Sequence, residues 1–287
     1  ANLNSSFTGP DYMDLGTAFG LFIGMLIIIF TVLTKNGDPI WFMDFGSVLI
    51  VLGGTLSATL VNYPLRNVQA LLRIVGAAFK RQNIEHLSVI DQLVEKADIS
   101  RKKGILALEP ELETINDKFL KDGLDLAINE RDSQRLRTYL ELEMSNIERR
   151  HSLGQEIFLY MGAYAPAFGM LGTVLGLIIM MKNFASSDPS DFGAMEFSVA
   201  ERFAELLGGM GLALITTFYG VLLSNLVFLP LAGKLKRKSE EELMVKDIMV
   251  EGIIGIHSKD HPIILREKLL TFVPQSSRKE DKNKNAS

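Results

Sequence analysis

Hydroxyl side chains and one proline mark the places in this sequence where uncharged oxygen atoms could gather. Thr173 lies in one long apolar stretch, and Thr216 and Thr217 are adjacent in another. Pro166 has no backbone N–H, so a helix that contains it leaves the carbonyl of Gly162 without its usual donor. Hydroxyl and carbonyl oxygens suit a hard cation. These residues therefore predict a cation path, with the simpler alternative that each hydroxyl only bonds its own or a neighbouring helix.

Charge is missing from the same stretches, and this constrains the chemistry. The four long apolar runs of the sequence contain no Asp, Glu, Lys, Arg or His, and the nearest carboxylate is Asp44 at the edge of the second run. Ion pathways through a membrane usually contain such a residue. Because neutral oxygens lack the counter-charge that a cation needs, the sequence predicts a partner helix that supplies an acidic side chain.

Other motifs give no support to an enzyme, a cofactor or a metal centre. The 287 residues include no cysteine, which excludes disulfides, cysteine zinc sites and a cysteine nucleophile. His257 and His261 have the spacing of two ligands on one helix face, but Pro262 follows directly and no third ligand accompanies them. The net charge of −4 argues against a general nucleic-acid binder. We expect a protein that is not an enzyme and has no cofactor, no metal and no nucleic-acid partner.

The four apolar runs are long enough to cross a membrane as helices. They are Leu15–Leu33 and Phe45–Tyr63, with 19 residues each, Ile157–Met181, with 25, and Leu206–Gly233, with 28. A helix needs about 20 apolar residues to span the core of a bilayer. The first run lacks the basic flank and the cleavage site of a signal peptide. We expect an all-α membrane protein with four transmembrane helices.

The basic residues predict how these helices are oriented. Of the 30 lysines and arginines, 15 lie in residues 64–156 and 12 in residues 234–287, whereas the loops 34–44 and 182–205 together hold three. Basic loops remain on the cytoplasmic side of the membrane. The sequence therefore predicts a multi-pass protein with both termini in the cytoplasm.

Helical periodicity continues through the basic segments. Apolar residues recur at helical spacing in Asn67–Arg81 and Ile84–Lys103, and Pro110 is expected in the first turn of the next helix. Asp132 or Ser133 is the expected cap of a long helix that continues into the third apolar run. The segment between the second and third runs is therefore an inserted helical cytoplasmic domain.

These expectations divide the chain into consecutive parts. The boundaries are a leader or remnant at 1–12, two transmembrane helices at 13–63, the cytoplasmic domain at 64–156, two transmembrane helices at 157–233, a cytoplasmic helical extension at 234–273 and a disordered polar tail at 274–287.

Five segments together resemble one protein family. They are MDLGTAFGLFIG at Met13–Gly24, FMDFGSVLIVLGG at Phe42–Gly54, ADISRKKGILALE at Ala97–Glu109, APAFGMLGTVLG at Ala165–Gly176 and LITTFYGVLLSNLVFLP at Leu214–Pro230. In order and pattern they are similar to the A subunits of bacterial flagellar stators, MotA and its sodium-type relative PomA, in the MotA/TolQ/ExbB superfamily.

This resemblance implies an ion-driven motor unit in the bacterial inner membrane. A homo-pentamer of A subunits, surrounded by membrane lipid, would enclose a dimer of a MotB- or PomB-like B subunit. That B subunit carries the missing membrane aspartate and is anchored to peptidoglycan. Ions passing the aspartate would turn the A ring, whose cytoplasmic helices would push the rotor protein FliG.

The resemblance also implies roles for individual residues. Arg101 and Glu109 match the charged pair that engages the rotor, and Lys234, Lys238 and Glu242 fall in a second charged patch. The positions that match the ion path are Asp44, Pro166, Thr173, Thr216 and Thr217, and Pro166 and Pro230 match prolines linked to conformational change.

The sequence leaves open which ion is transported and to which branch of the superfamily the chain belongs. The pair Thr216–Thr217 and Asp44 look more like the sodium type, so sodium is favoured over protons. The outer loop 182–205 is longer than is usual in the family, and its sequence indicates no role. The alternative functions are a TolQ- or ExbB-like proton-driven energiser, whose relatives usually have three spans, and a membrane scaffold without an ion role.

Overall fold

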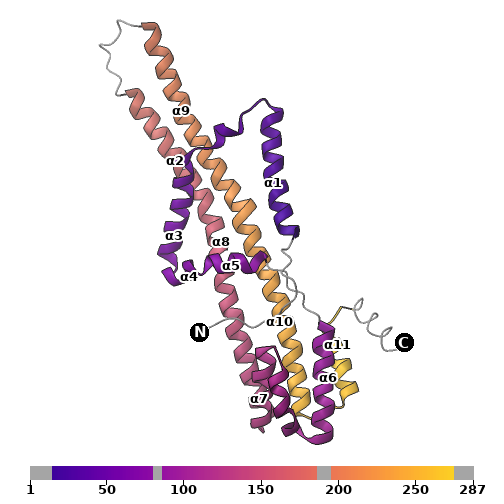
Figure 1. Ribbon diagram of the computed structural model, residues 1–287. Coiled ribbons are helices and arrows are strands. Elements are labelled where there is room, and N and C mark those ends of the chain that lie inside the picture. The colour runs from indigo at the N-terminus through magenta and orange to yellow at the C-terminus, as the bar shows by residue number, and fades with distance from the viewer. Residues whose placement is uncertain (1–14, 80–85, 186–194, 275–287) are drawn as a thin grey trace. The chain divides into compact units, whose positions relative to one another are not determined.

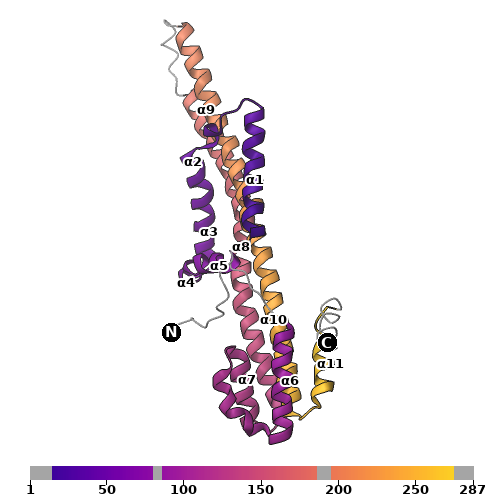
Figure 2. The same ribbon diagram turned by 45° about the vertical axis from the view of Figure 1, so that its right-hand side comes forward.

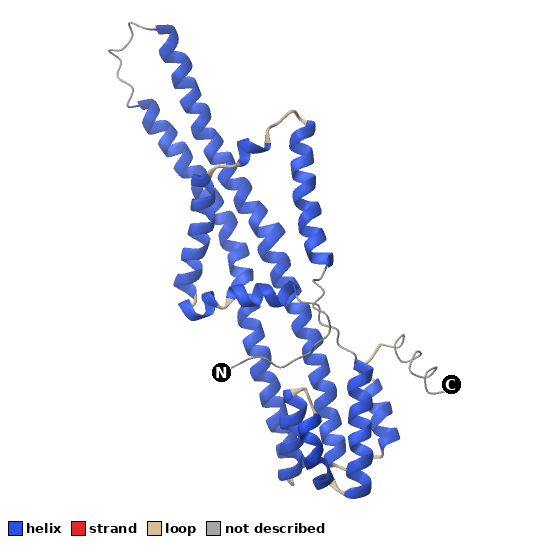
Figure 3. Ribbon diagram, in the orientation of Figure 1, coloured by secondary structure: helices blue, strands red, loops and turns tan. Residues whose placement is uncertain are grey.

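The computed structural model describes residues 15–79, 86–185 and 195–274. Every regular element in these residues is a helix, and Figure 3 shows helices joined by short loops, with no strand in the described part of the chain. The all-helical class expected from the sequence is confirmed. The expected leader at 1–12, all but Pro274 of the expected tail at 274–287 and residues 186–194 of the outer loop lie outside the described residues.

The chain forms two compact units, each built from separated stretches of sequence (Figure 1). The apolar unit comprises the described residues of 12–80 and 153–235, and the polar unit comprises those of 81–152 and 236–287. The long helices α8 (Ser133–Ala185) and α10 (Leu229–His257) contribute a part to each unit.

The helices of the apolar unit follow the charge-free runs of the sequence. Its further elements are α1 (Leu15–Thr34), η1 (Pro39–Phe42), α2 (Phe45–Val48), η2 (Leu49–Gly53), α3 (Gly54–Asn62), α4 (Leu65–Gln69), α5 (Leu71–Phe79), α9 (Met195–Leu222) and η5 (Leu223–Phe228). Within the described residues, three helical stretches are long and apolar enough to cross a membrane, Pro39–Asn62, Ser133–Lys182 and Leu206–His257, and Phe19–Thr34 is a shorter apolar helix.

The surface of the apolar unit is itself apolar. Large side chains such as Phe22, Phe30, Ile178 and Leu214 are exposed on its helices. Soluble monomers rarely expose extended apolar surface, whereas helices in a bilayer bury such side chains in lipid. Together with the helix lengths, this surface is that of a multi-pass membrane protein.

The single helix expected over Asn67–Arg81 is divided in two. The N–H of Ala70 bonds to the carbonyl three residues earlier, a tight turn that separates α4 from α5. Leu71 at the start of α5 is buried in a cluster that includes Ile157 and Phe158 of α8. Both α4 and α5 belong to the apolar unit.

In the polar unit, shorter helices pack around the ends of two long ones. Figure 2 shows α6 (His86–Lys103), α7 (Lys118–Asn129) and α11 (Pro262–Leu270) gathered around the parts of α8 and α10 that belong to this unit. The segment η3 (Ile105–Thr114) joins α6 to α7. The largest fully buried side chains of the shared core include Ile90, Leu93, Leu108, Leu124, Leu140, Ile253 and Leu265.

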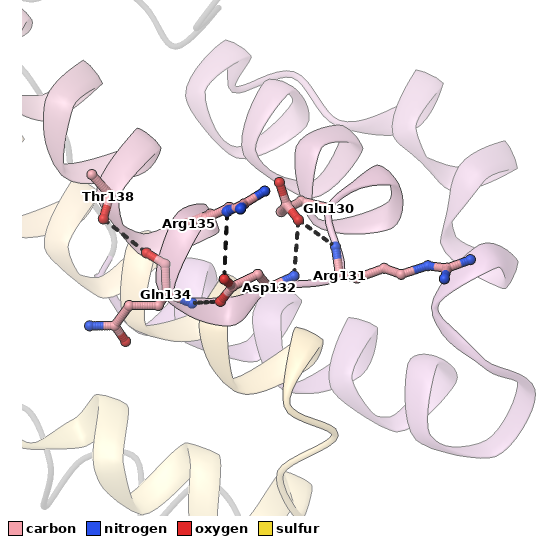
Figure 4. A network of polar contacts seen from close by, with 6 residues as sticks. All are labelled: Glu130, Arg131, Asp132, Gln134, Arg135 and Thr138. Atoms are coloured by element: carbon pink, nitrogen blue, oxygen red, sulfur yellow. Dashed lines mark hydrogen bonds and ion pairs between the residues drawn. The ribbon is translucent and has the colours of Figure 1, made fainter.

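A network of polar contacts fixes the start of α8 (Figure 4). One oxygen of Asp132 accepts the backbone N–H of Gln134 at 2.9 Å, and the other lies 3.6 Å from Nε of Arg135. The carboxylate of Glu130 accepts the two N–H groups that follow it in the chain. Of the two caps that the sequence allows, the structure selects Asp132 rather than Ser133.

Pro110 does not begin a helix, contrary to the expectation from sequence. It lies inside η3, a tight 3₁₀ segment, and α7 begins only at Lys118. The helix starts there because the side chain of Asp117 caps its first turn by accepting the N–H of Leu120 at 2.9 Å.

Candidate functional site

The expected ion-path residues lie on α8 and α9, which pack against each other with their backbones in close approach. A Cβ added at Gly176 of α8 would lie 3.1 Å from the backbone nitrogen of Ala213. A Cβ added at Gly220 of α9 would lie 2.6 Å from the carbonyl oxygen of Ala165. Small residues permit this approach, which drives helix association in membranes.

Thr216 is fully buried in this interface. A Cβ at Gly172 would lie 2.6 Å from the Cβ of Thr216, so the side chain fits only because residue 172 is glycine. The Thr216 hydroxyl lies 3.1 Å and 2.9 Å from the carbonyl oxygens of Leu212 and Ala213, which accept its hydrogen bond. Thr216 therefore fills a packing position between α8 and α9.

Thr173 and Thr217 are half-buried rather than enclosed. The Thr173 hydroxyl donates to the carbonyl of Met170, and the Thr217 hydroxyl donates to that of Ala213 at 3.4 Å. Both hydroxyl hydrogens are therefore used within their own helices, as in the alternative in which each hydroxyl only bonds a helix. A hydroxyl that donates one bond still has lone pairs that can accept or coordinate, so both side chains keep an oxygen for a further partner.

The carbonyl that Pro166 deprives of its helical donor does have a partner. The hydroxyl of Ser224 donates to the carbonyl of Gly162 at 2.6 Å. Ser224 is 3% exposed and lies in the π-helical segment η5. The bond joins η5, which continues α9, to α8. The carbonyl affected by Pro166 and the π-helical segment are therefore bonded to each other.

Pro230 is the second residue of α10, separated from η5 by Leu229, and it is exposed. The N–H of Leu229 bonds to the carbonyl of Ser224, the wide spacing of a π-helix. Since Pro230 cannot donate the next bond of the ladder, the irregular turn and the proline form one continuous interruption of the helix.

Asp44 caps α2. One of its carboxylate oxygens accepts the backbone N–H of Ser47 at 2.5 Å. The neighbouring segment is held to α9 by the hydroxyl of Tyr219, which donates to the carbonyl of Phe42 at 2.6 Å. Asp44 therefore has a structural role as a helix cap, and its half-buried carboxylate lies beside the α2–α9 contact.

Arg101 and Glu109 are both exposed in the polar unit. They lie on either side of Gly104, whose φ of 88° is one that side-chain-bearing residues rarely adopt. This glycine sets the angle between the end of α6 and η3, and so the placement of the two charges.

The second expected patch has a different character. Glu242 lies 3.7 Å from Nζ of Lys246 and 4.0 Å from the ring of His151, and the Lys246 ammonium lies 4.9 Å from the ring centre of Phe119. Glu242 thus pairs with Lys246 of its own helix and lies beside His151 of α8 within the polar unit. Lys234 and Lys238 are half-buried.

Sequence reasoning missed an ion-pair cluster in the polar unit. Glu251 accepts from Arg137 and from Lys268, each at 2.6 Å, and so ties α8, α10 and α11 together. The hydrogen bond from Arg137 holds the pKa of Glu251 below its usual 4.5. Burial raises the pKa of Asp247, and the charges of Glu251 and Glu148 add to that rise.

The two helically spaced histidines act separately. The ring of His257 bonds to the carbonyl oxygen of Glu130 at 2.9 Å, and His261 caps α11 by accepting the N–H of Ile263. In the described ranges no group of three or more His, Cys, Asp or Glu side chains could hold a metal ion.

Known proteins resemble this chain over nearly its whole length. The model of the MotA/TolQ/ExbB proton channel family matches residues 111–247. Motility protein A of Borreliella burgdorferi is 36% identical over 267 residues, which cover 93% of this chain and 96% of that protein. Chemotaxis protein PomA of Vibrio alginolyticus is 33% identical over 266 residues, covering 93% and 98%.

A solved structure has the same fold. In the flagellar MotAB stator complex from Bacillus subtilis, one chain matches with a TM-score of 0.79 at 28% sequence identity. The match covers 92% of this chain and 97% of that one.

Proposed function

Since this chain belongs to the MotA/PomA family of flagellar stator A subunits, within the MotA/TolQ/ExbB proton channel family, we propose that it converts ion flow into torque on the flagellar rotor. It is a multi-pass membrane subunit of a MotAB-type stator complex and not an enzyme. In the proposed mechanism a B subunit supplies the aspartate that binds the ion, and this chain supplies the ring that turns around it.

The observation that carries the proposal is a contrast within the apolar runs. They contain neutral oxygens and a proline at the α8–α9 contact but no Asp, Glu, Lys, Arg or His. A cation in the hydrocarbon core requires a counter-charge. This chain offers neutral oxygens along the path but no charge. It is therefore suited to act with a B subunit that supplies the acidic side chain.

In this proposal four helices cross the inner membrane, two within 13–63 and two within 157–233. The helix α1 is the first of them, since its 20 residues meet the length that a bilayer requires. The segments 64–156 and 234–273 lie in the cytoplasm with both termini, as the distribution of basic residues favours.

Torque would reach the rotor through exposed charges. Five copies of the chain would form the ring, and Arg101 and Glu109 would engage FliG. Their exposure on either side of Gly104 supports this assignment. Lys234, Lys238 and Glu242 would form a second patch.

Sodium is the ion that we propose. The adjacent Thr216 and Thr217 and the outer carboxylate of Asp44 resemble the sodium type, and PomA is among the relatives. Swimming speed should then follow external sodium. A speed that is independent of sodium and abolished by a protonophore would instead indicate proton flow.

A motility assay tests the ion path. The chain is expressed with its B partner in cells that lack other stators, and Thr173→Ala and Thr217→Ala each remove one hydroxyl oxygen. Both variants should slow swimming at unchanged membrane levels of the protein, because each loses a lone pair beside the path. Thr31→Ala is the matched control, since Thr31 makes the same kind of bond within its own helix but lies in α1, outside the residues assigned to the path.

Swimming at full speed in both path variants would favour the scaffold alternative. Failure of the unaltered chain and its partner to restore any motility would overturn the stator proposal itself.

A further inference from the structure

A hydrogen bond between two helices occupies the carbonyl of Gly162, one turn before Pro166. Ser224 donates to Gly162 at 2.6 Å, although the two residues are 62 positions apart. In an uninterrupted helix, residue 166 would donate to that carbonyl, but Pro166 has no N–H. An unpaired carbonyl in the membrane interior is costly, because no water is available to bond it.

We propose that Ser224 is a positioning residue, which fixes α8 at the carbonyl that Pro166 leaves without a donor by donating to that Gly162 carbonyl. The proposal rests on the proposed function, in which Pro166 lies at the ion path. The bond fixes the direction of the carbonyl one turn before the proline and joins it to η5. Loss of the bond would let the α8–α9 register relax where the path requires a fixed shape.

The surrounding packing explains why the hydroxyl reaches this carbonyl. One turn before Ser224, a Cβ at Gly220 would lie 3.1 Å from the Cα of Pro166, so the two backbones are already in contact there. The wider turn of η5 begins immediately afterwards. On the other side, a Cβ at Gly162 would lie 2.7 Å from a methyl group of Leu229, so Leu229 packs directly against the backbone of Gly162.

Ser47 shows that burial alone does not define this role. Its hydroxyl is fully buried in the same unit but has no hydrogen-bond partner. The two serines therefore differ in one respect that matters here, the bond to a carbonyl that lacks its helical donor.

The experiment uses the full chain in complex with its B partner. Ser224→Ala removes the donor without adding volume, Ser224→Thr keeps it, and Ser47→Ala is the matched control. We expect a several-fold loss of motor torque in Ser224→Ala at normal assembly, and none in Ser47→Ala. Wild-type torque in Ser224→Ala would overturn the proposal.

A spectroscopic readout separates the bond from general packing. Labelling glycine carbonyl carbons and alanine nitrogens marks the three Gly–Ala peptide bonds of the sequence, after Gly76, Gly162 and Gly193. In solid-state NMR of the complex in lipid, Ser224→Ala should shift the Gly162 carbonyl signal, whereas Ser224→Thr should leave it near the wild-type position. A Gly162 signal that does not move in the alanine variant, or that moves equally in the threonine variant, would refute the assignment.

The Ser224 bond and the motor function can be tested separately. The NMR measurement reports the bond whether or not the complex drives motility. A wild-type complex that does not restore swimming would contradict the proposed function, while an unshifted carbonyl would contradict only the role of Ser224.

Discussion

At the scale of single residues, the hydroxyl groups of the apolar unit differ in the partner that each one finds. Thr173, Thr216 and Thr217 donate to carbonyls of their own helix, as threonine commonly does in a helix. Ser224 donates across to α8. A hydroxyl therefore bonds within its own helix in one place and joins two helices in another. The position of the nearest carbonyl oxygen decides between the two.

Exposed charges allow a direct test of rotor contact. Reversing both Arg101 and Glu109, by Arg101→Glu and Glu109→Lys, should reduce torque measured on tethered cells without reducing the amount of stator in the membrane. Surface charges contribute little to folding. The loss of torque would therefore come from weaker contact with the rotor.

The matched control reverses a neighbouring exposed pair. Lys102 and Asp98 lie 2.6 Å apart in α6, and exchanging them keeps the total charge. Undiminished torque in the Arg101 and Glu109 reversal, or an equal loss in the control, would contradict a specific rotor role.

The ion-pair cluster of the polar unit predicts a pH dependence of stability. Because the pKa of Glu251 is lowered, its ionised form stabilises the fold above the ordinary value of 4.5, and this contribution is lost as pH falls below it. Glu251→Gln should cost about 1–2 kcal/mol at neutral pH, since Arg137 and Lys268 lose a charged acceptor.

The measurement is the thermal unfolding midpoint of the purified complex, followed from neutral pH to below 4.5. The difference from wild type should shrink in acid. Asp247, whose pKa is raised mainly by burial, opposes the acid loss in both proteins, and does so less in Glu251→Gln, which lacks the Glu251 charge that adds to that rise. The exposed Glu241→Gln should match wild type at every pH, and a constant deficit in Glu251→Gln would argue against this linkage.

At the scale of elements, α8 and α9 form one closely packed pair, and glycine positions set its spacing. Gly172 accommodates Thr216, and Gly220 lies against Ala165. These contacts follow a helical repeat along both helices, so close approach is a property of the whole interface. The irregular turn η5 lies at the end of this repeat, with Leu229 between it and Pro230.

Gly220→Ala should disrupt this pair. The new methyl group would lie 2.6 Å from a backbone oxygen, so the helices must separate, at a cost of about 1–3 kcal/mol. Assembly with the B subunit, measured by co-purification, should fall. Gly208→Ala is the control, because a Cβ there meets no atom within 4 Å. Equal yields from the two variants would contradict the proposed tightness of the contact.

At the scale of the whole molecule, the uneven distribution of charge determines what the chain can do alone. Its apolar runs contain no Asp, Glu, Lys, Arg or His, so an ion inside them has no counter-charge from this chain. In liposomes, the chain without a B subunit should therefore conduct neither sodium nor protons measurably. A substantial current from the chain alone would refute this division of labour, and co-reconstitution with the B subunit is the positive control.

Much of the fold follows from local sequence. The apolar runs predict helices because a backbone without water must bond internally, and Asp132 predicts the start of α8 because its carboxylate accepts a free N–H. Local rules failed at Pro110 and at Ala70. At Pro110 the chain forms a 3₁₀ segment and the next helix starts at the Asp117 cap downstream, and at Ala70 the chain turns although its apolar pattern continues.

The sequence by itself determined that the chain is helical, apolar in long runs and free of charge within them, because these properties depend only on composition and spacing. It also showed that Pro166 deprives the carbonyl of Gly162 of a donor. Only the tertiary structure decided that Ser224 supplies the replacement, because that contact depends on the register between two helices. Backbone approach at glycine sets this register, and local periodicity does not encode it.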